Sequence, residues 1–198
     1  SDSGGIAAYY GDITIRRTHF HHHLTYTTLF VSGQTASVLE DLTFDHNTVL
    51  GAGMAHFDAP TTLTRWTVQD NEVVAATVYF GSHGTVLDSV FRNNRATSTD
   101  GGAISGVSGL TIRNSVFSGN TAKGKGGAIH HSASNYGQTA PNDGGLLLEN
   151  CLLHHNSADG DGGAVYATAG SLPATTPGPE IRGCTLAHNS AKNGGAVY

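Results

Sequence analysis

A short motif recurs along this chain of 198 residues, and its spacing constrains the fold more than any other feature. The motif is a large apolar residue followed three positions later by asparagine, as in Phe44 and Asn47. The anchor positions are His23, Asn47, Asn71, Asn94, Asn120, Asn156 and Asn189. They are separated by 24, 24, 23, 26, 36 and 33 residues. Such a chain grows by stacking about seven similar coils rather than by folding round one central core.

Two apolar columns accompany the anchors. Three residues before each anchor stand Phe20, Phe44, Val68, Phe91, Phe117, Leu153 and Leu186, and eight residues before it stand Ile15, Leu39, Leu63, Val86, Ile112, Leu148 and Ile181. Because one coil of about 24 residues cannot bury a face alone, we expect stacked coils to pair their strands and bury both columns continuously. The phenylalanines should stack on one another, and each asparagine amide should donate and accept along the axis.

A second motif closes most coils with two glycines, an alanine and a branched apolar residue. It occurs at 101–104, 126–129, 162–165 and 194–197, with variants at 4–6 and 53–55. Glycine pairs permit a corner with positive φ and a tight inner wall. The chain contains 27 glycines and only one methionine and one tryptophan, a composition poor in helix formers. The expected fold is therefore all-β, a right-handed parallel β-helix of about seven coils.

A leucine-rich-repeat-like solenoid is the alternative fold, because the same columns also match the spacing of leucine-rich repeats. Against it, the column five residues before the anchor ends in Ser89, Ser115, Cys151 and Cys184. The half of each coil that would form a convex helix consists of Gly-Gly-Ala followed by isoleucine or valine. These strand and breaker signals favour the β-helix.

The chain is expected to form a single β-helix segment over residues 1–198, interrupted by two insertions at about 131–144 and 167–178. Both insertions follow the glycine motif, so both should leave the solenoid at the same corner, where repeat proteins often carry their binding loops. The candidate binding residues in these loops are Tyr136, Pro141, Asn142, Pro173, Thr175 and Thr176. A tolerated surface insertion is the simpler reading of both segments.

Cys151 and Cys184 both lie five residues before their anchors, so they are expected to stack on adjacent coils about 5 Å apart. This distance is within the range that a disulfide accepts. The alternative is that both residues fill the small core position that Ser89 and Ser115 occupy in earlier coils. The sequence leaves both possibilities open.

The chain contains 12 histidines, of which His19, His21, His22 and His23 lie together. One residue before the anchors stand His22, His46, His155 and His188, which form two separate vertical pairs. A zinc site needs three or four convergent ligands. The pattern therefore favours polar residues that fill turns, and we expect no metal and no cofactor.

Catalysis on polysaccharides would require paired carboxylates, or a carboxylate cluster with a basic residue, in a groove. The best candidate column lies six residues before the anchors and comprises Arg17, Asp41, Arg65, Asp88, Asn114, Asn150 and Gly183. Its charges alternate, which charge pairing between neighbouring coils explains without catalysis. The net charge of −5, with only 13% charged residues, offers no basic patch for nucleic acid.

The alternation of Phe44-Asp45-His46-Asn47, Phe91-Arg92-Asn93-Asn94 and Phe117-Ser118-Gly119-Asn120 with the glycine motifs resembles the passenger repeats of the chlamydial polymorphic membrane proteins. The resemblance covers all seven coils, although the first three are degenerate. It implies an autotransporter passenger that acts as a surface adhesin, and hence an extracellular or cell-surface location.

We therefore expect a non-enzymatic, extracellular structural or adhesive segment that presents side loops to a host-cell or extracellular glycan or protein. Two alternatives remain: a building block of a filament or glycan-coated surface fibre, and a polysaccharide lyase or hydrolase of the pectate-lyase-like class. Strand edges are expected to be open at both ends, where the rest of the same polypeptide or neighbouring copies would stack.

Overall fold

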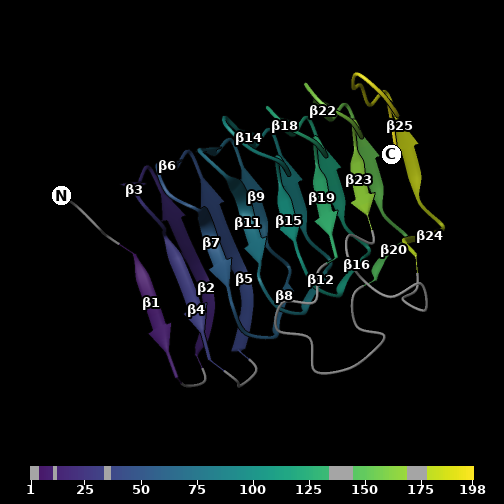
Figure 1. Ribbon diagram of the computed structural model, residues 1–198. Helices are drawn as coiled ribbons and strands as arrows, with labels where there is room; N and C mark the ends of the chain where they lie inside the picture. Colours follow the sequence, from purple (N-terminus) through teal and green to yellow (C-terminus); the bar gives the residue numbers. More distant parts are fainter. Residues whose placement is uncertain (1–4, 11–12, 34–36, 134–144, 169–177) are drawn as a thin grey trace.

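The computed structural model describes residues 5–10, 13–33, 37–133, 145–168 and 178–198. Every regular element in this part of the chain is a β-strand, and the strands wind into a parallel β-helix (Figure 1). The expected all-β solenoid is confirmed. The leucine-rich-repeat-like alternative is wrong, because the residues after Gly-Gly-Ala at 101–103, 126–128 and 162–164 form strands where that fold would require a helix.

The first face of the β-helix, sheet A, takes one strand from each coil, and all seven strands pair in parallel. Its strands are β1 (Ile6–Tyr9), β4 (Leu29–Ser32), β7 (Gly53–Phe57), β11 (Ala76–Phe80), β15 (Ile104–Gly106), β19 (Ile129–Ser132) and β23 (Val165–Thr168). Figure 1 shows this sheet facing the viewer, from purple β1 to green β23. From β15 onward, each strand begins on the last residue of the glycine motif.

The second face, sheet B, contains the positions between eight and three residues before the anchors. Its twelve strands are β2 (Thr14–His21), β5 (Ser37–Asp45), β8 (Thr61–Thr64), β9 (Thr67–Gln69), β12 (Gly84–Leu87), β13 (Val90–Arg92), β16 (Leu110–Arg113), β17 (Val116–Ser118), β20 (Leu146–Glu149), β21 (Leu152–His154), β24 (Glu180–Arg182) and β25 (Thr185–Ala187). In the first two coils this face is one continuous strand, β2 or β5, whereas each later coil has two shorter strands in the same region. The register pairs Phe20 with Phe44 and Phe91 with Phe117.

The third face, sheet C, is a row of two-residue strands that directly follow the anchors. Its six strands are β3 (Leu24–Thr25), β6 (Thr48–Val49), β10 (Glu72–Val73), β14 (Arg95–Ala96), β18 (Thr121–Ala122) and β22 (Ser157–Ala158). In each of them the second residue points inward and is buried. Small residues at Ala96, Ala122 and Ala158 keep this side of the coil close to the core.

Residues with a left-handed backbone form two corners of every coil. At six residues before the anchor they are Arg17, Asp41, Arg65, Asp88, Asn114, Asn150 and Gly183, and at one residue before it His22, His46, Asp70, Asn93, Gly119, His155 and His188. Asparagine, aspartate, histidine and glycine tolerate this conformation better than other residues. The residues six positions before the anchors, whose alternating charges the sequence explained as pairing between coils, therefore also form the bend in sheet B.

The glycine motif makes a third corner, where its two glycines have different physical roles. Gly126 has a φ of 66°, which a residue with a side chain adopts only with strain. A Cβ added to Gly127 would lie 2.2 Å from the carbonyl oxygen of Gly163 in the next coil. The first glycine therefore turns the chain, and the second lets neighbouring backbones approach.

The interior contains both apolar columns expected from the sequence, and their central members are fully buried. Phe91 and Phe117 stack with ring centroids 4.9 Å apart and planes inclined by 2°. Asn120 accepts hydrogen bonds from the backbone and the amide of Asn94, and its own amide donates to the Phe91 carbonyl and to Asn156. The same pattern runs from Asn47 through Asn71 to Asn189, so each buried amide is satisfied along the axis.

Candidate functional site

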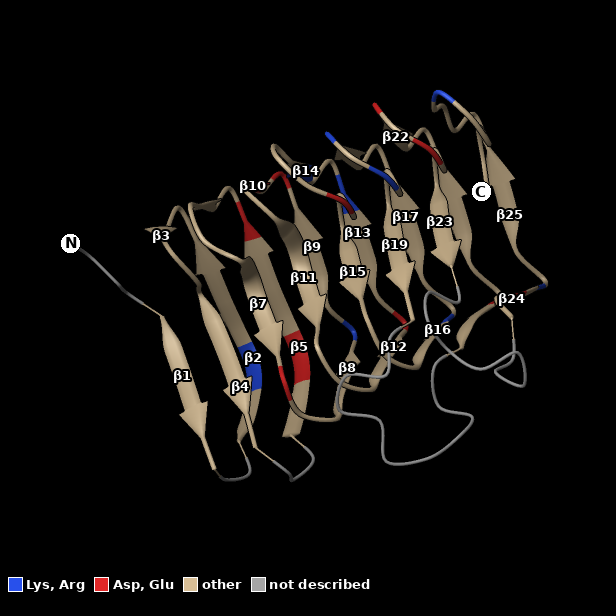
Figure 2. Ribbon diagram, in the orientation of Figure 1, with Lys and Arg blue, Asp and Glu red and all other residues tan. Residues whose placement is uncertain are grey.

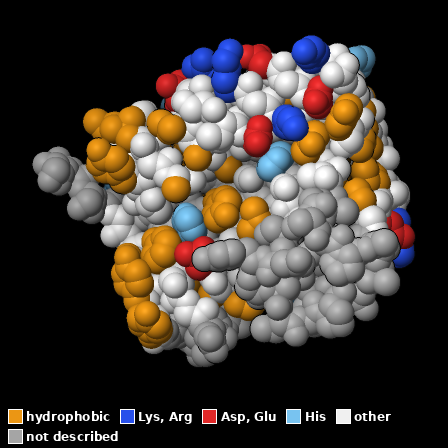
Figure 3. Space-filling model, in the orientation of Figure 1, with side chains coloured by type: hydrophobic (Ala, Val, Ile, Leu, Met, Phe, Trp, Pro, Cys, Tyr) orange, Lys and Arg blue, Asp and Glu red, His pale blue; other side chains and the backbone are white. Residues whose placement is uncertain are grey.

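The outer surface of sheet A carries a column of aromatic side chains in continuous register. The column consists of Phe30, His56, Tyr79, Ser105, His130, Tyr166 and Tyr198. Alternate residues of a strand point to opposite faces, so the flanking residues fill the core while these side chains project outward. Figure 3 shows this face, on which orange hydrophobic side chains surround pale-blue histidine. We call this set the aromatic column.

The rings of the aromatic column form two runs that contact ring to ring. In the first run, Phe30 and His56 lie 5.2 Å apart between ring centroids, and His56 and Tyr79 lie 4.7 Å apart. In the second run, Tyr166 lies 5.4 Å from His130 and 5.5 Å from Tyr198, with planes inclined by only 10° and 8°. Ser105 separates the runs. Aromatic pairs at these distances stabilise one another, so the surface is preorganised.

Charged side chains border the column and are held against its rings. His56 Nε2 lies 3.0 Å from Asp58 Oδ1. Lys125 Nζ donates to the Tyr166 hydroxyl at 3.1 Å and lies 4.4 Å from the centre of that ring. The hydrogen bond to Tyr166 raises the pKa of Lys125, so the ammonium group stays charged over the ring. The face therefore offers apolar ring surface beside fixed hydrogen-bonding groups.

A shallow hollow lies where the aromatic column is interrupted. Tyr79, Asp100, Ser105 and His130 line it together with small residues of neighbouring coils. Its volume of ≈ 240 Å³ is below the roughly 300–1,000 Å³ of typical small-molecule pockets, so it suits one ring of a larger ligand better than a whole enclosed molecule. Burial lowers the pKa of His130, partly opposed by the nearby Asp100 carboxylate and reinforced by Lys125. Its Nδ1 lies 3.3 Å from Ser105 Oγ and its Nε2 lies 3.5 Å from Asp100 Oδ2, so the ring is held in place within the hollow.

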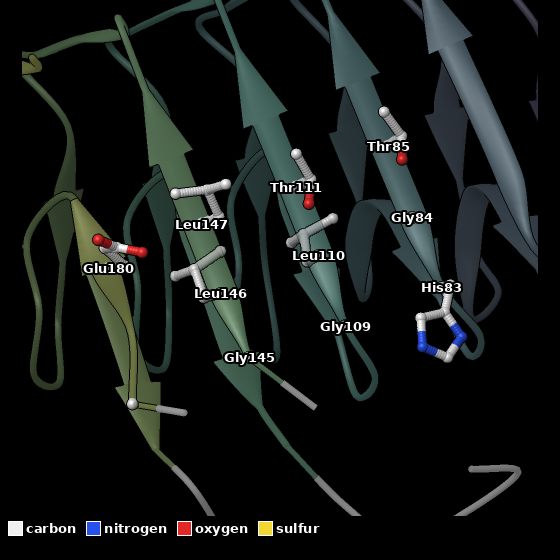
Figure 4. Close-up of a pocket in the computed structure, with 11 residues that line it drawn as sticks. His83, Gly84, Thr85, Gly109, Leu110, Thr111, Gly145, Leu146, Leu147 and Glu180 are labelled. Carbon is white, nitrogen blue, oxygen red and sulfur yellow. The ribbon is translucent and has the colours of Figure 1, made fainter. Parts of the chain in front are cut away.

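A second hollow runs across sheet B between β12 and β24 (Figure 4). Its walls are mostly backbone and threonine or leucine side chains, including Thr85, Thr111 and Leu147. Among the lining residues that the structure describes, Glu180 is the one carboxylate, and its side chain is paired with Arg182. The described part of this hollow therefore shows one carboxylate, whereas glycoside hydrolysis usually uses two.

The best candidate column for catalysis was the one six residues before the anchors. Its side chains form ion pairs and hydrogen bonds with one another. Asp41 accepts from Arg65 at 2.6 and 3.0 Å, and this hydrogen-bonded pair holds the pKa of Asp41 below its ordinary value. Figure 2 shows the blue band of arginines on β2 beside the red band of acidic residues on β5. Asp88 accepts from Asn114 one coil later. These contacts link neighbouring coils.

The two cysteines stack on adjacent coils and are free thiols in the structure, which corresponds to the core-filling alternative of the two that the sequence left open. The backbone N–H of Cys151 donates to Cys184 Sγ at 3.3 Å, and Cys184 Sγ donates to the Arg182 carbonyl. Ser115 makes the same two contacts, accepting from Ser89 N–H and donating to the Arg113 carbonyl. Each sulfur thus occupies the place of a serine hydroxyl.

The predicted binding loops fall largely outside the described residues, which include none of Tyr136, Pro141, Asn142, Pro173, Thr175 and Thr176. The boundaries of both insertions differ from the prediction. Strand β19 extends through Ser132 and β23 through Thr168, since both pair in register as part of sheet A. The strands that precede the two insertions carry His130 and Tyr166 of the aromatic column.

Sequence reasoning missed the aromatic column, although its signal is visible. His130, Tyr166 and Tyr198 each directly follow a Gly-Gly-Ala-[Ile/Val] motif, but the earlier members belong to coils in which this motif is degenerate. The steps between members of the column range from 23 to 36 residues, so only the strand register aligns Phe30 with Tyr166.

Comparison with protein families gives two matches. The family described as the right-handed beta helix region matches residues 1–137, and the Chlamydia polymorphic membrane protein repeat matches residues 150–168. The second match confirms the resemblance inferred from the repeated motifs. Comparison with curated proteins and with solved structures gives no match. Within the described residues, there is no helix that could cross a membrane.

Together the two matches indicate a β-helix protein of the surface type. The first match covers more than half of the chain, and its description agrees with the parallel strand order in all three sheets. The chain belongs to the right-handed β-helix family.

Proposed function

We propose that this chain is a non-enzymatic extracellular segment with a structural and adhesive role, and that it binds glycans along the aromatic column. The single observation that carries this proposal is the continuous outward register of rings from Phe30 to Tyr198 across sheet A. The match to a membrane protein repeat supports the surface location.

The chemistry of the column suits carbohydrate. Aromatic rings give this face apolar surface, against which the C–H groups that cover one side of a sugar ring can pack. The sugar hydroxyls then lie at the edge, within reach of groups such as Asp58, Asp100 and Lys125. Coils spaced about 4.8 Å apart repeat these contacts along the axis, so an extended glycan would meet a new side chain at every coil.

Several features argue for binding rather than turnover. Asp41 is engaged by Arg65, and the carboxylate in the hollow of Figure 4 is engaged by Arg182. The two hollows are shallow, and water exclusion around a reacting bond usually requires a closed site. Release of reducing ends from a polysaccharide by the purified chain would contradict the proposal.

A glycan array probed with the 198-residue chain tests the proposal. We expect retention on a defined class of glycans, and loss of that signal in the variants Tyr79→Ser and Tyr166→Ser. Serine is chosen because the column itself contains Ser105 at an equivalent position. The control is Tyr26→Ser, which removes a tyrosine that is 69% exposed and lies outside the column. An array without binding, or equal binding by all variants, would reject the proposal.

A further inference from the structure

A group of imidazoles and one carboxylate lies on the outside of the first two coils. We call His19, His21, His22, Asp45 and His46 the histidine cluster. His19 and His21 belong to β2, His22 forms the left-handed corner after it, and Asp45 ends β5 in the next coil. The sheet register places His21 directly beside Asp45. Residues 24 positions apart in the chain are thus neighbours.

Three of these side chains converge on one point. His21, His22 and Asp45 each offer a ligand atom, and the three atoms lie within 4.8 Å of one another. Among the residues that the structure describes, no other group of three histidine, cysteine or acidic side chains converges in this way. The side chains of His21 and His22 are exposed, so an ion has free access from solvent.

The left-handed corner explains why consecutive histidines can act together. Neighbouring residues of a regular strand point to opposite faces. His22 has a φ of 56°, which turns its side chain back to the side of His21 and brings the two Nδ1 atoms to 3.0 Å. Two ligand nitrogens on a tetrahedral zinc ion, at bond lengths of about 2.0–2.1 Å, lie roughly 3.4 Å apart. The pair is therefore close to the spacing that zinc requires.

The carboxylate is positioned by further members of the cluster. Asp45 Oδ2 lies 2.9 Å from His19 Nε2, and Oδ1 lies 3.6 Å from His46 Nδ1. The rings of His22 and His46 stack at 5.3 Å, which limits rotation of His22. Such supporting contacts orient metal ligands in known sites.

We propose that His21, His22 and Asp45 bind a zinc ion, with His19 as a positioning residue for Asp45 and a water molecule as the fourth ligand. Two imidazoles and one carboxylate, with one open position, form a donor set that zinc accepts. The ion would join the corner after β2 to the end of β5 and hold the first coil on the second. The sequence pattern favoured turn filling because it does not reveal that His22 turns toward His21.

The same chain contains a natural comparison for this site. His154 and His155 form a second histidine pair at the equivalent corner, with their Nδ1 atoms 2.8 Å apart. In the next coil, the residue in register with His154 is Ala187 rather than an aspartate. The second pair therefore has the two imidazoles but lacks the carboxylate. The proposal predicts zinc binding at the first pair and not at the second.

Isothermal titration of the metal-free 198-residue chain with zinc chloride tests this assignment. We expect one equivalent to bind, and the variants His21→Gln, His22→Asn and Asp45→Asn to lose it. Asparagine is used at position 22 because it tolerates the left-handed backbone. His19→Gln should weaken binding by about 10–100-fold, as removal of supporting contacts commonly does. Calcium, which prefers six to eight oxygen ligands, should not bind.

Two matched variants at the second histidine pair test whether zinc binding depends on the carboxylate in the next coil. His155→Asn should leave the zinc affinity and stoichiometry unchanged. Ala187→Asp should create a second site and raise the stoichiometry from one to two, provided that circular dichroism shows an intact β-helix. The proposal is overturned if the wild-type chain binds no zinc, if Asp45→Asn binds like the wild type, or if His155→Asn abolishes binding. A folded Ala187→Asp variant that still binds one equivalent would also count against the role of the carboxylate.

Discussion

Asn94 and Asn120 are joined by two hydrogen bonds to one oxygen: the amide and the backbone N–H of Asn94 both donate to Asn120 Oδ1, at 3.0 and 3.1 Å. Because Asn120 is fully buried, none of these groups can turn to water if its partner is removed. The backbone N–H of Asn94 would be left without an acceptor. The ladder thus connects the coil corners through side chains as well as through strand pairing.

The first prediction concerns this ladder. Asn120→Ala should lower the free energy of unfolding by at least about 3 kcal/mol, because each buried polar group left unsatisfied costs about 1–3 kcal/mol. Urea denaturation measures the change. The control is Asn193→Ala, which removes an exposed hydrogen bond to Asp161 and should cost less than about 1 kcal/mol. Equal losses in the two variants would show that the ladder contributes nothing beyond an exposed contact.

The fold was largely predictable because the residues that face the core recur at fixed positions in each repeat. Positions such as Phe91 and Asn94 recur at fixed offsets, and a stacked solenoid is the fold that buries all of them together. The corner residues were harder to recognise, since Arg17 and Arg65 adopt a left-handed backbone that their residue type does not suggest. Asparagine, aspartate and glycine at the equivalent positions of other coils were the available signal.

The candidate site was less predictable, because it depends on register rather than on motif. Ser105 interrupts the aromatic column, and Phe30 and His56 come from coils without a complete glycine motif. Only the pairing of β4, β7 and β11 shows that Phe30, His56 and Tyr79 are neighbours. The contact between His21 and His22 depends in the same way on one backbone angle.

The second prediction concerns the phenylalanine stack. Phe117→Ala should cost about 3–5 kcal/mol, because it leaves a cavity in a fully buried column. Phe117→Leu should cost less than about 1.5 kcal/mol, because the next coil carries Leu153 at the same position. Urea denaturation of both variants tests this order. If leucine is as harmful as alanine, the stack depends on ring geometry and not only on filled volume.

The third prediction concerns pH. His131 is 2% exposed, and burial lowers its pKa, opposed by its hydrogen bond to the Ser108 carbonyl and reinforced by neighbouring His130. The unfolded chain therefore takes up this proton at a higher pH than the folded chain does. Its contribution to stability is complete above the ordinary imidazole pKa of 6.5 and is lost as pH falls below that value.

The variant His131→Gln keeps a donor for Ser108 but cannot take up this proton. Between pH 7.5 and 5.5 it should lose less stability than the wild-type chain in urea denaturation. If His131→Gln and the wild type lose stability in parallel, protonation of His131 is not the cause.

The fourth prediction concerns the cysteines. Burial raises the pKa of Cys151 to about 11, offset in part by its hydrogen bond with the Ser115 backbone. Since the thiolate is the reactive form, iodoacetamide at pH 8 should modify Cys184 first and Cys151 only after unfolding. Peptide mass mapping distinguishes the two. A chain purified without reductant should contain two titratable thiols, and the absence of both would show that the disulfide forms after all.

The binding constant for the glycan that the array identifies tests the central claim most directly. Titration should show that Tyr79→Ser and Tyr166→Ser together weaken binding at least tenfold, equivalent to about 1.4 kcal/mol, whereas Tyr26→Ser leaves the dissociation constant unchanged. The expected loss follows from the removal of two rings of the aromatic column. Unchanged affinity in the double variant would contradict the account and direct attention to residues 134–144 and 169–177 in the insertions.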